Sequence, residues 1–163
     1  MADKKLTRAQ RNNNPGNIMY SGIKWDGMVG VDPDGFIIFS NPDMGWRAMV
    51  KNTINRAAAD PKGTLNDYIQ RYASTSSEEE RRAYVDTVAK KTGTTPDTIL
   101  STYDPYKLSQ SMADVETGNT MQLDQGTYER IKAMLNSKKK VTNASNQVGK
   151  ESNGSYDETV RVK

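Results

Sequence analysis

Two parts of this sequence combine residue types that could act on a sugar or peptide. The first is the run RNNNPGN at residues 11–17. Asn and Gly readily adopt positive φ, whereas Pro holds φ at about −65°, so the run predicts a loop of defined shape. Its side-chain amides can bond the backbone or present donors and acceptors to a ligand. An ordinary turn in front of a hairpin is the other interpretation.

Glu116 is the second candidate, because it falls at the C-terminal end of a predicted helix, just before Gly118. Cleavage of a glycosidic bond needs a carboxylic acid that stays protonated near neutral pH. Unpaired carbonyls and the negative end of the helix dipole disfavour a charged carboxylate there, more so if Met112 and Val115 shield it. An exposed helix-end carboxylate without a catalytic role fits the same pattern, so the residues alone leave both interpretations open.

A second carboxylate is less clearly indicated. Asp32 and Asp34 have the pattern of turn residues, and Asp43 stands where any helix favours an acid. Asp26, next to Trp25, is the remaining candidate near the loop. A lytic transglycosylase can work with one acid, because the substrate's own hydroxyl closes on the sugar.

Aromatic and amide side chains near this loop could bind a glycan. Tyr20 and Trp25 could stack on sugar rings, and Asn17 could hydrogen-bond them, although either aromatic could equally belong to a hairpin core. The predicted substrate-binding residues are therefore Asn14, Asn17, Tyr20, Trp25 and Asp26.

Composition narrows the chemistry further. The 163 residues include no Cys and no His, which removes thiolate nucleophiles, the usual proton shuttle and the commonest metal ligands. We therefore expect no metal and no cofactor. Residues 1–136 carry 17 Lys+Arg and 17 Asp+Glu, so the net charge of +3 belongs to residues 137–163. A neutral folded part argues against a nucleic-acid-binding face.

The chain is expected to form one domain at 11–136, between a flexible N-terminus at 1–10 and a polar, basic tail at 137–163. The tail has too few apolar residues to offset its ordering entropy, so we expect it to be disordered or ordered by a partner. No apolar run approaches the roughly 20 residues that cross a bilayer, and no signal peptide is recognisable.

The fold class expected from these patterns is α+β, with a small antiparallel sheet packed on a mainly helical body. Strand-like pieces and helical periodicities alternate with turn and cap signals. The strand pieces are 18–20, 23–25, 29–31 and 36–39. The helices begin near residues 42, 64, 76, 95, 104 and 123, and the last of them is expected to end at Leu135.

These motifs resemble a family of tailed-bacteriophage virion proteins described as structural or lysozyme-like. The likeness rests on RNNNPGNI at 11–18, W-x-G at 25–27, GF-x-x-F at 35–39 and G-x-RAM at 45–49, and extends in register over roughly 8–118. The M-x-x-x-E-x-G step at 112–118 also matches. The resemblance implies a virion protein, made in the host cytoplasm, that cuts peptidoglycan glycan strands during genome entry, meets other virion proteins and uses Glu116 as its acid.

The opening block is also similar to that of bacterial peptidoglycan glucosaminidases. In those enzymes the acidic residue precedes this block, so the order here implies a circularly permuted lysozyme-like fold. The chain departs from the phage family in two places: Ser74 to Ser76 stand where prolines are usual, and the Pro-Tyr often found after Gly118 is missing. The second departure adjoins Glu116 and supports an alternative, a virion structural protein without catalysis. A nucleic-acid-binding internal protein is a third hypothesis and rests on the tail alone.

Overall fold

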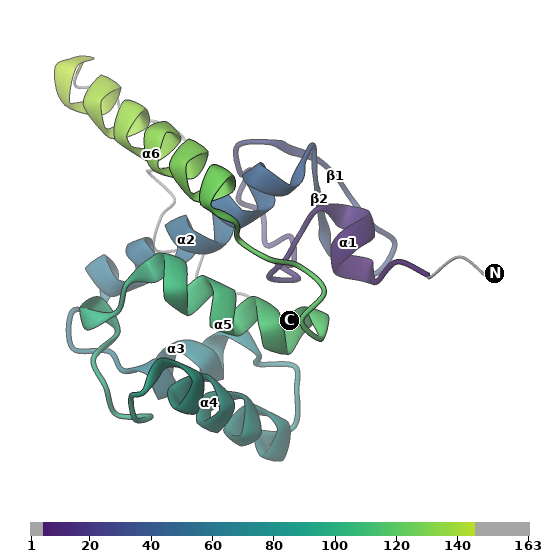
Figure 1. The fold of residues 1–163 in the computed structure, drawn as a ribbon, viewed down its shortest axis with the longest axis vertical. Coiled ribbons are helices and arrows are strands. Elements are labelled where there is room, and N and C mark those ends of the chain that lie inside the picture. The colour runs from purple at the N-terminus through teal and green to yellow at the C-terminus, as the bar shows by residue number, and fades with distance from the viewer. Residues whose placement is uncertain (1–4, 146–163) are drawn as a thin grey trace.

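The computed structural model describes residues 5–145, and Figure 1 shows the arrangement of their helices and strands. These residues form a mixed α+β fold with a small antiparallel sheet, which confirms the expected class at that level. The elements in chain order are α1 (Arg8–Asn12), β1 (Met28–Val31), β2 (Ile37–Phe39), α2 (Pro42–Ala59), α3 (Leu65–Tyr72), α4 (Glu78–Thr92), the 3-10 helix η1 (Leu100–Thr102), α5 (Pro105–Thr117) and α6 (Gln125–Ser145).

The helices begin at residues whose side chains bond the first-turn N–H groups. Asn41 accepts a hydrogen bond from the Met44 backbone N–H at the start of α2. Thr64 and Ser77 form capping boxes at the starts of α3 and α4. Gly118 ends α5 in the left-handed conformation, with φ of 62°. Such caps satisfy otherwise unpaired groups, so local sequence predicted these positions well.

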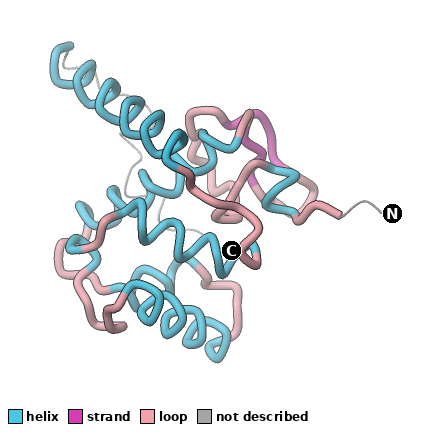
Figure 2. The backbone as a smooth tube through the Cα atoms, in the orientation of Figure 1, coloured by secondary structure: helices cyan, strands magenta, loops and turns pink. Residues whose placement is uncertain are grey.

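The sheet is smaller than expected. β1 and β2 pair antiparallel (Figure 2). Met19 adds an isolated bridge to Phe36. The prediction of a strand at 23–25 was wrong. Positive φ at Gly22 and Gly27 bends the chain on both sides of this piece, and Trp25 turns into the core at 3% exposure.

The N-terminal boundary also needs correction, because the predicted flexible segment 1–10 includes the start of a helix. Thr7 and Gln10 form a capping box on α1, and Ala9 is buried. The T-x-x-Q spacing is a helix-start signal that the sequence interpretation overlooked. Residues 1–4 lie outside the described part of the chain.

At the other end, α6 continues through Ser145 and projects away from the helical body (Figure 1). The expected end of this helix at Leu135, and the expected domain boundary at 137, therefore both fall inside α6. Ile131 is fully buried, and Arg130 forms an ion pair with Asp43 of α2. Residues 146–163 of the predicted tail lie outside the described residues.

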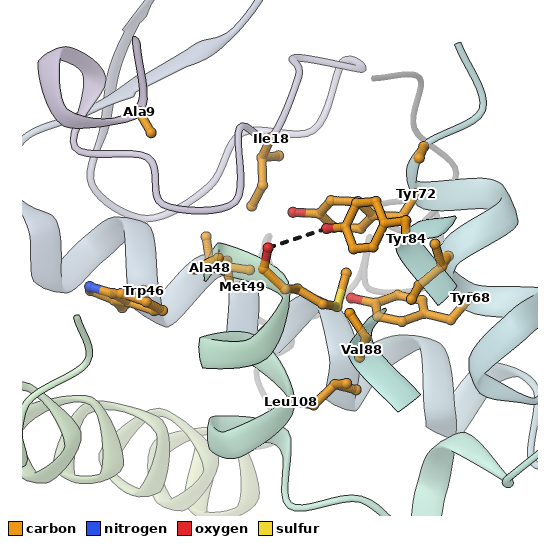
Figure 3. Close-up of a cluster of buried hydrophobic side chains, with 14 of the residues drawn as sticks. Ala9, Ile18, Trp46, Ala48, Met49, Tyr68, Tyr72, Tyr84, Val88 and Leu108 are labelled. Carbon is orange, nitrogen blue, oxygen red and sulfur yellow. Dashed lines mark hydrogen bonds between the residues drawn. The ribbon is translucent and has the colours of Figure 1, made fainter. Parts of the chain in front are cut away.

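One hydrophobic core joins α2, α3, α4 and α5 to the N-terminal loop and β2. Ile18 from the loop is fully buried in it, as are Ala48 of α2 and Leu108 of α5 (Figure 3). Burial of this kind supplies most of the favourable free energy of folding. Within the described residues, no helix has the length and apolar character needed to cross a membrane.

Candidate functional site

Asn14 holds the N-terminal loop together from inside. Its Oδ1 accepts a hydrogen bond from Ile18 N–H, and its Nδ2 donates to the carbonyls of Ile18 and Ile37, all at 2.9 Å. The side chain is fully buried and thus satisfies backbone groups that would otherwise lack partners. A buried amide has no surface to offer a glycan, so the structure corrects the predicted substrate-binding role of Asn14 to a structural one.

The loop is pressed closely against the helical body. Tyr72 of α3 donates a hydrogen bond of 2.6 Å to the Gly16 carbonyl, in a buried position. A Cβ on Gly16 would lie 2.4 Å from the Tyr72 hydroxyl oxygen, so only glycine fits there. Asn13 and Asn17 have positive φ, 54° and 47°, as expected for a loop built from Asn and Gly. The RNNNPGN motif therefore has a fixed place relative to the helices.

That place brings Asn17 to Glu116, which is 99 residues further along the chain. The Asn17 side-chain amide donates to Glu116 Oε1 at 3.3 Å and to the Glu116 backbone carbonyl at 3.2 Å. The Tyr84 hydroxyl of α4 donates to Glu116 Oε2 at 2.9 Å. Two distant parts of the chain, the N-terminal loop and α4, thus orient this half-buried carboxyl group at the end of α5.

The Tyr84 hydroxyl stays protonated and can therefore donate its hydrogen bond to Glu116. Burial raises its pKa well above the ordinary value, and the charge of Glu116 and the neighbouring Tyr72 raise it further. The phenol therefore keeps its proton throughout the physiological pH range.

The Glu116 groove, as we name it, is an open cavity of about 410 Å³ between α4, the end of α5 and the N-terminal loop. Glu116, Asn17 and Tyr84 are at its wall. Its lining consists of Asn17, Ser76, Glu80, Ala83, Tyr84, Thr87, Val115 and Glu116. A groove with two acids, several hydroxyls and a modest apolar surface suits a polar polymer such as a glycan.

The second carboxylate in this groove is Glu80, not the predicted Asp26. Asp26 pairs with the buried Arg47 of α2, at 3.4 Å between Oδ2 and Nη2, and does not line the groove. Glu80 belongs to an acidic run that was interpreted as a solvated helix face, and its Oε1 accepts a hydrogen bond from Ser77 N–H as part of the α4 cap. The local sequence pattern predicts the helix start, but it cannot show which cavity the Glu80 side chain borders.

The two predicted aromatic binders lie elsewhere. Trp25 is buried in the core and has almost no surface for stacking, so the predicted stacking role is wrong for this residue. Tyr20 is 46% exposed but does not line the Glu116 groove. Of the five predicted substrate-binding residues, only Asn17 reaches the groove. The sequence pattern did not predict a site role for Tyr84, because its spacing in α4 is that of an apolar core residue. Its hydroxyl group was the one feature that could have indicated a hydrogen-bonding role.

No group of three or more His, Cys, Asp or Glu side chains that could hold a metal ion occurs among residues 5–145. Compared with known proteins, the chain matches no protein-family model and no curated protein.

Proposed function

We propose that this protein cleaves the glycan strands of bacterial peptidoglycan, with Glu116 as general acid, and that its α+β fold is a circularly permuted lysozyme-like fold. One observation carries the proposal. The Glu116 carboxyl borders an open groove, and Asn17 of the RNNNPGN motif and Tyr84 both hold it in place. A positioned carboxyl in a groove of this size is what acid-catalysed glycan cleavage requires.

In the proposed reaction, protonated Glu116 gives its proton to the glycosidic oxygen as the bond from that oxygen to the anomeric carbon breaks. The bonding electron pair stays on the leaving oxygen, and positive charge develops on the sugar ring. The Glu116 carboxylate left behind still accepts hydrogen bonds from Asn17 and Tyr84. These donors keep it oriented to take a proton back in the second step.

The second step has two possible routes, and Glu80 distinguishes them. If Glu80 activates a water molecule, the products have reducing ends. If Glu116 alone serves as acid and then as base, the substrate's own hydroxyl closes on the ring and leaves an anhydro end. Both side chains line the same groove, so the chemical nature of the product ends decides between the two routes.

The resemblance of the sequence motifs to the phage family suggests where this reaction takes place. We propose that the protein is carried in the virion, contacts other virion proteins and opens peptidoglycan locally during genome entry. The neutral charge of residues 1–136 suits an uncharged glycan backbone better than nucleic acid.

A second candidate is a virion structural protein that keeps the fold without catalysis. Both oxygens of Glu116 already accept hydrogen bonds from the protein, so the residue has a sufficient role in tying the N-terminal loop to α5. In that case Glu116 is a structural carboxylate, and purified protein would not cut peptidoglycan.

The test is clearance of purified peptidoglycan, followed by turbidity, with product masses to identify reducing or anhydro ends. Glu116→Gln keeps the shape and the acceptor oxygen but cannot supply the proton, so we expect cleavage to slow by about 10²- to 10⁴-fold. Glu80→Gln keeps an acceptor for the α4 cap and should slow only the hydrolytic route. Glu129→Gln, on the exposed face of α6, is the matched control.

The outcomes separate the hypotheses. An active wild-type protein and an equally active Glu116→Gln variant of unchanged melting temperature would refute the catalytic assignment. An inactive wild-type protein that still binds peptidoglycan would favour the structural candidate.

A further inference from the structure

A second cavity, of about 450 Å³, lies between the end of α4 and the start of α5. Its lining includes two lysines, Lys91 and Lys107, together with hydroxyl groups from Thr94, Tyr103 and Ser111. We name it the lysine cavity. The mechanism proposed for Glu116 makes no use of it.

The lysine cavity and the Glu116 groove lie along the same pair of helices. Tyr84, early in α4, bonds Glu116 at the end of α5, whereas the lysine cavity joins the end of α4 to the start of α5, so the helices run antiparallel. Residues three, four or seven apart share one helix face. On α4 these lining residues are Glu80, Thr87 and Lys91, and on α5 they are Lys107, Ser111 and Val115.

One face of each helix therefore lines both cavities. Lys107 and Val115 are eight positions apart, which corresponds to about 12 Å of helix rise and exceeds the length of a single sugar ring. A polymer whose reacting bond lies at Glu116 would thus reach the lysine cavity with a neighbouring unit or side branch.

The charge of the lysine cavity is carried mainly by Lys107. Its side chain is exposed and forms no ion pair within residues 5–145. The Lys91 ammonium lies 3.6 Å from Asp114 Oδ2 and is partly neutralised. Asp104 also lines the cavity, but its carboxylate caps α5 by accepting from the Tyr106 and Lys107 N–H groups. The positive end of the helix dipole offsets that negative charge.

The hydroxyl groups form a hydrogen-bonded chain. Thr92 lies within hydrogen-bond distance of the Val88 and Ala89 carbonyls and 2.9 Å from the Thr94 hydroxyl oxygen. Thr94 and Tyr103 share a hydrogen bond of 2.5 Å. A hydroxyl oxygen has two lone pairs, so these groups can also accept from a ligand N–H or O–H. Cationic donors and hydroxyl acceptors therefore meet in one cavity.

We propose that the lysine cavity binds a carboxylate on the same polymer that occupies the Glu116 groove, with Lys107 as the principal cation. This inference rests on the proposed function, because peptidoglycan is a glycan whose repeating units carry carboxylates. These belong either to the peptide branch or, where the peptide has been removed, to the lactyl group of the sugar. Ammonium-to-carboxylate hydrogen bonds are charge-assisted and tolerate varied geometry, as a branch of variable position requires.

The experiment measures binding of three soluble strands to the Glu116→Gln protein, which is used to suppress turnover. The strands are peptide-bearing peptidoglycan fragments, the same fragments after enzymatic removal of the peptide, and neutral N-acetylglucosamine oligomers. Lys107→Gln is added to this background, and Lys62→Gln, an exposed lysine outside both cavities, is the matched control. We expect Lys107→Gln to weaken binding of a carboxylate-bearing strand by about 3- to 10-fold.

Loss confined to the peptide-bearing strand places the carboxylate on the peptide, and loss confined to the peptide-free strand places it on the lactyl group of the sugar. Loss on both acidic strands shows that Lys107 binds either carboxylate. In each case added salt should weaken strand binding by the protein that keeps Lys107, and leave binding by the Lys107→Gln variant nearly unaffected. Equal binding by the Lys107→Gln and Lys62→Gln proteins would overturn the inference, as would an equal loss on the neutral oligomer. Cleavage by wild-type protein is measured separately, so an inactive enzyme with a Lys107-dependent affinity would refute the proposed function and leave this site standing.

Discussion

Asn14 and Asn17 have the same side chain and lie three residues apart, yet they serve different purposes. Asn14 is enclosed by backbone groups of its own loop and of β2. Asn17 has left-handed backbone geometry and turns its amide across the molecule to Glu116. A short run of one residue type therefore contains both a structural amide and a site residue, and only their surroundings distinguish them.

At this scale we predict that Asn14→Ala lowers the free energy of unfolding by about 2–4 kcal/mol, because it leaves buried N–H and C=O groups without partners. Chemical denaturation measures the change. Asn66→Ala is the control: this half-exposed side chain accepts a hydrogen bond from the Gln70 side chain, and its loss should cost less than about 0.5 kcal/mol. Equal losses from the two substitutions would show that Asn14 does not hold the loop.

Among the elements, α2 and the N-terminal loop are in close contact. Gly45, in the first turn of α2, faces the loop so closely that a Cβ would lie 1.9 Å from the Asn13 carbonyl oxygen. Asn13 in turn donates to the Phe39 carbonyl at the end of β2. The N-terminus of α2 thereby sets where the loop, and with it Asn17, meets the helical body.

Whether Gly45→Ala stabilises or destabilises the protein tests this packing. Alanine normally stabilises a helix relative to glycine by up to about 1 kcal/mol, but we expect Gly45→Ala to destabilise by about 2–4 kcal/mol or to prevent folding. Gly126→Ala, in the first turn of α6, would place a Cβ 3.2 Å from Arg130 Nη1 and 3.4 Å from Asp124 Oδ1, both at the ends of side chains, and should be neutral or stabilising. Melting temperature and soluble yield are the measurements. A Gly45→Ala protein at least as stable as wild type would contradict the arrangement.

At the scale of the whole molecule, the ionised carboxylate of Asp32 joins several segments of the N-terminal part through hydrogen bonds and an ion pair. Asp32 Oδ2 accepts from Asn12 at 2.9 Å, its Oδ1 accepts from the N–H groups of Asp34 and Phe36, and Arg8 lies 3.7 Å away. Burial raises the pKa of Asp32, but these hydrogen bonds and Arg8 together outweigh it, and the pKa is lowered. The ionised carboxylate therefore stabilises the fold.

Because the folded-state pKa of Asp32 lies below the unfolded value of 3.8, its contribution is present above that pH and is lost as pH falls through the folded pKa. We expect Asp32→Asn to be less stable than wild type at pH 7, and the difference to shrink at pH 3. Urea midpoints at the two pH values measure this. The control is Asp97→Asn, at an exposed position. An Asp32→Asn deficit that grows toward pH 3 would contradict the assignment.

Much of the secondary structure could be predicted from short stretches of sequence. Asn41, Thr64, Ser77 and Gly118 cap their helices within a residue or two of the expected ends, because a cap depends on groups within one turn. The α+β class followed from the same local patterns. The strand expected at 23–25 failed because pairing depends on a distant partner segment and on where the glycines bend the chain.

The candidate site was decided by tertiary packing. Sequence alone marked Glu116 as a carboxyl at a helix end and Asn17 as a loop amide, but their meeting depends on how α5 packs against a loop 99 residues away. The same packing buried Trp25, engaged Asp26 with Arg47, and placed Glu80 and Tyr84 beside Glu116. Local sequence determines backbone propensity and caps because those interactions are short-ranged; which side chains share a groove depends on the burial of the whole core at once.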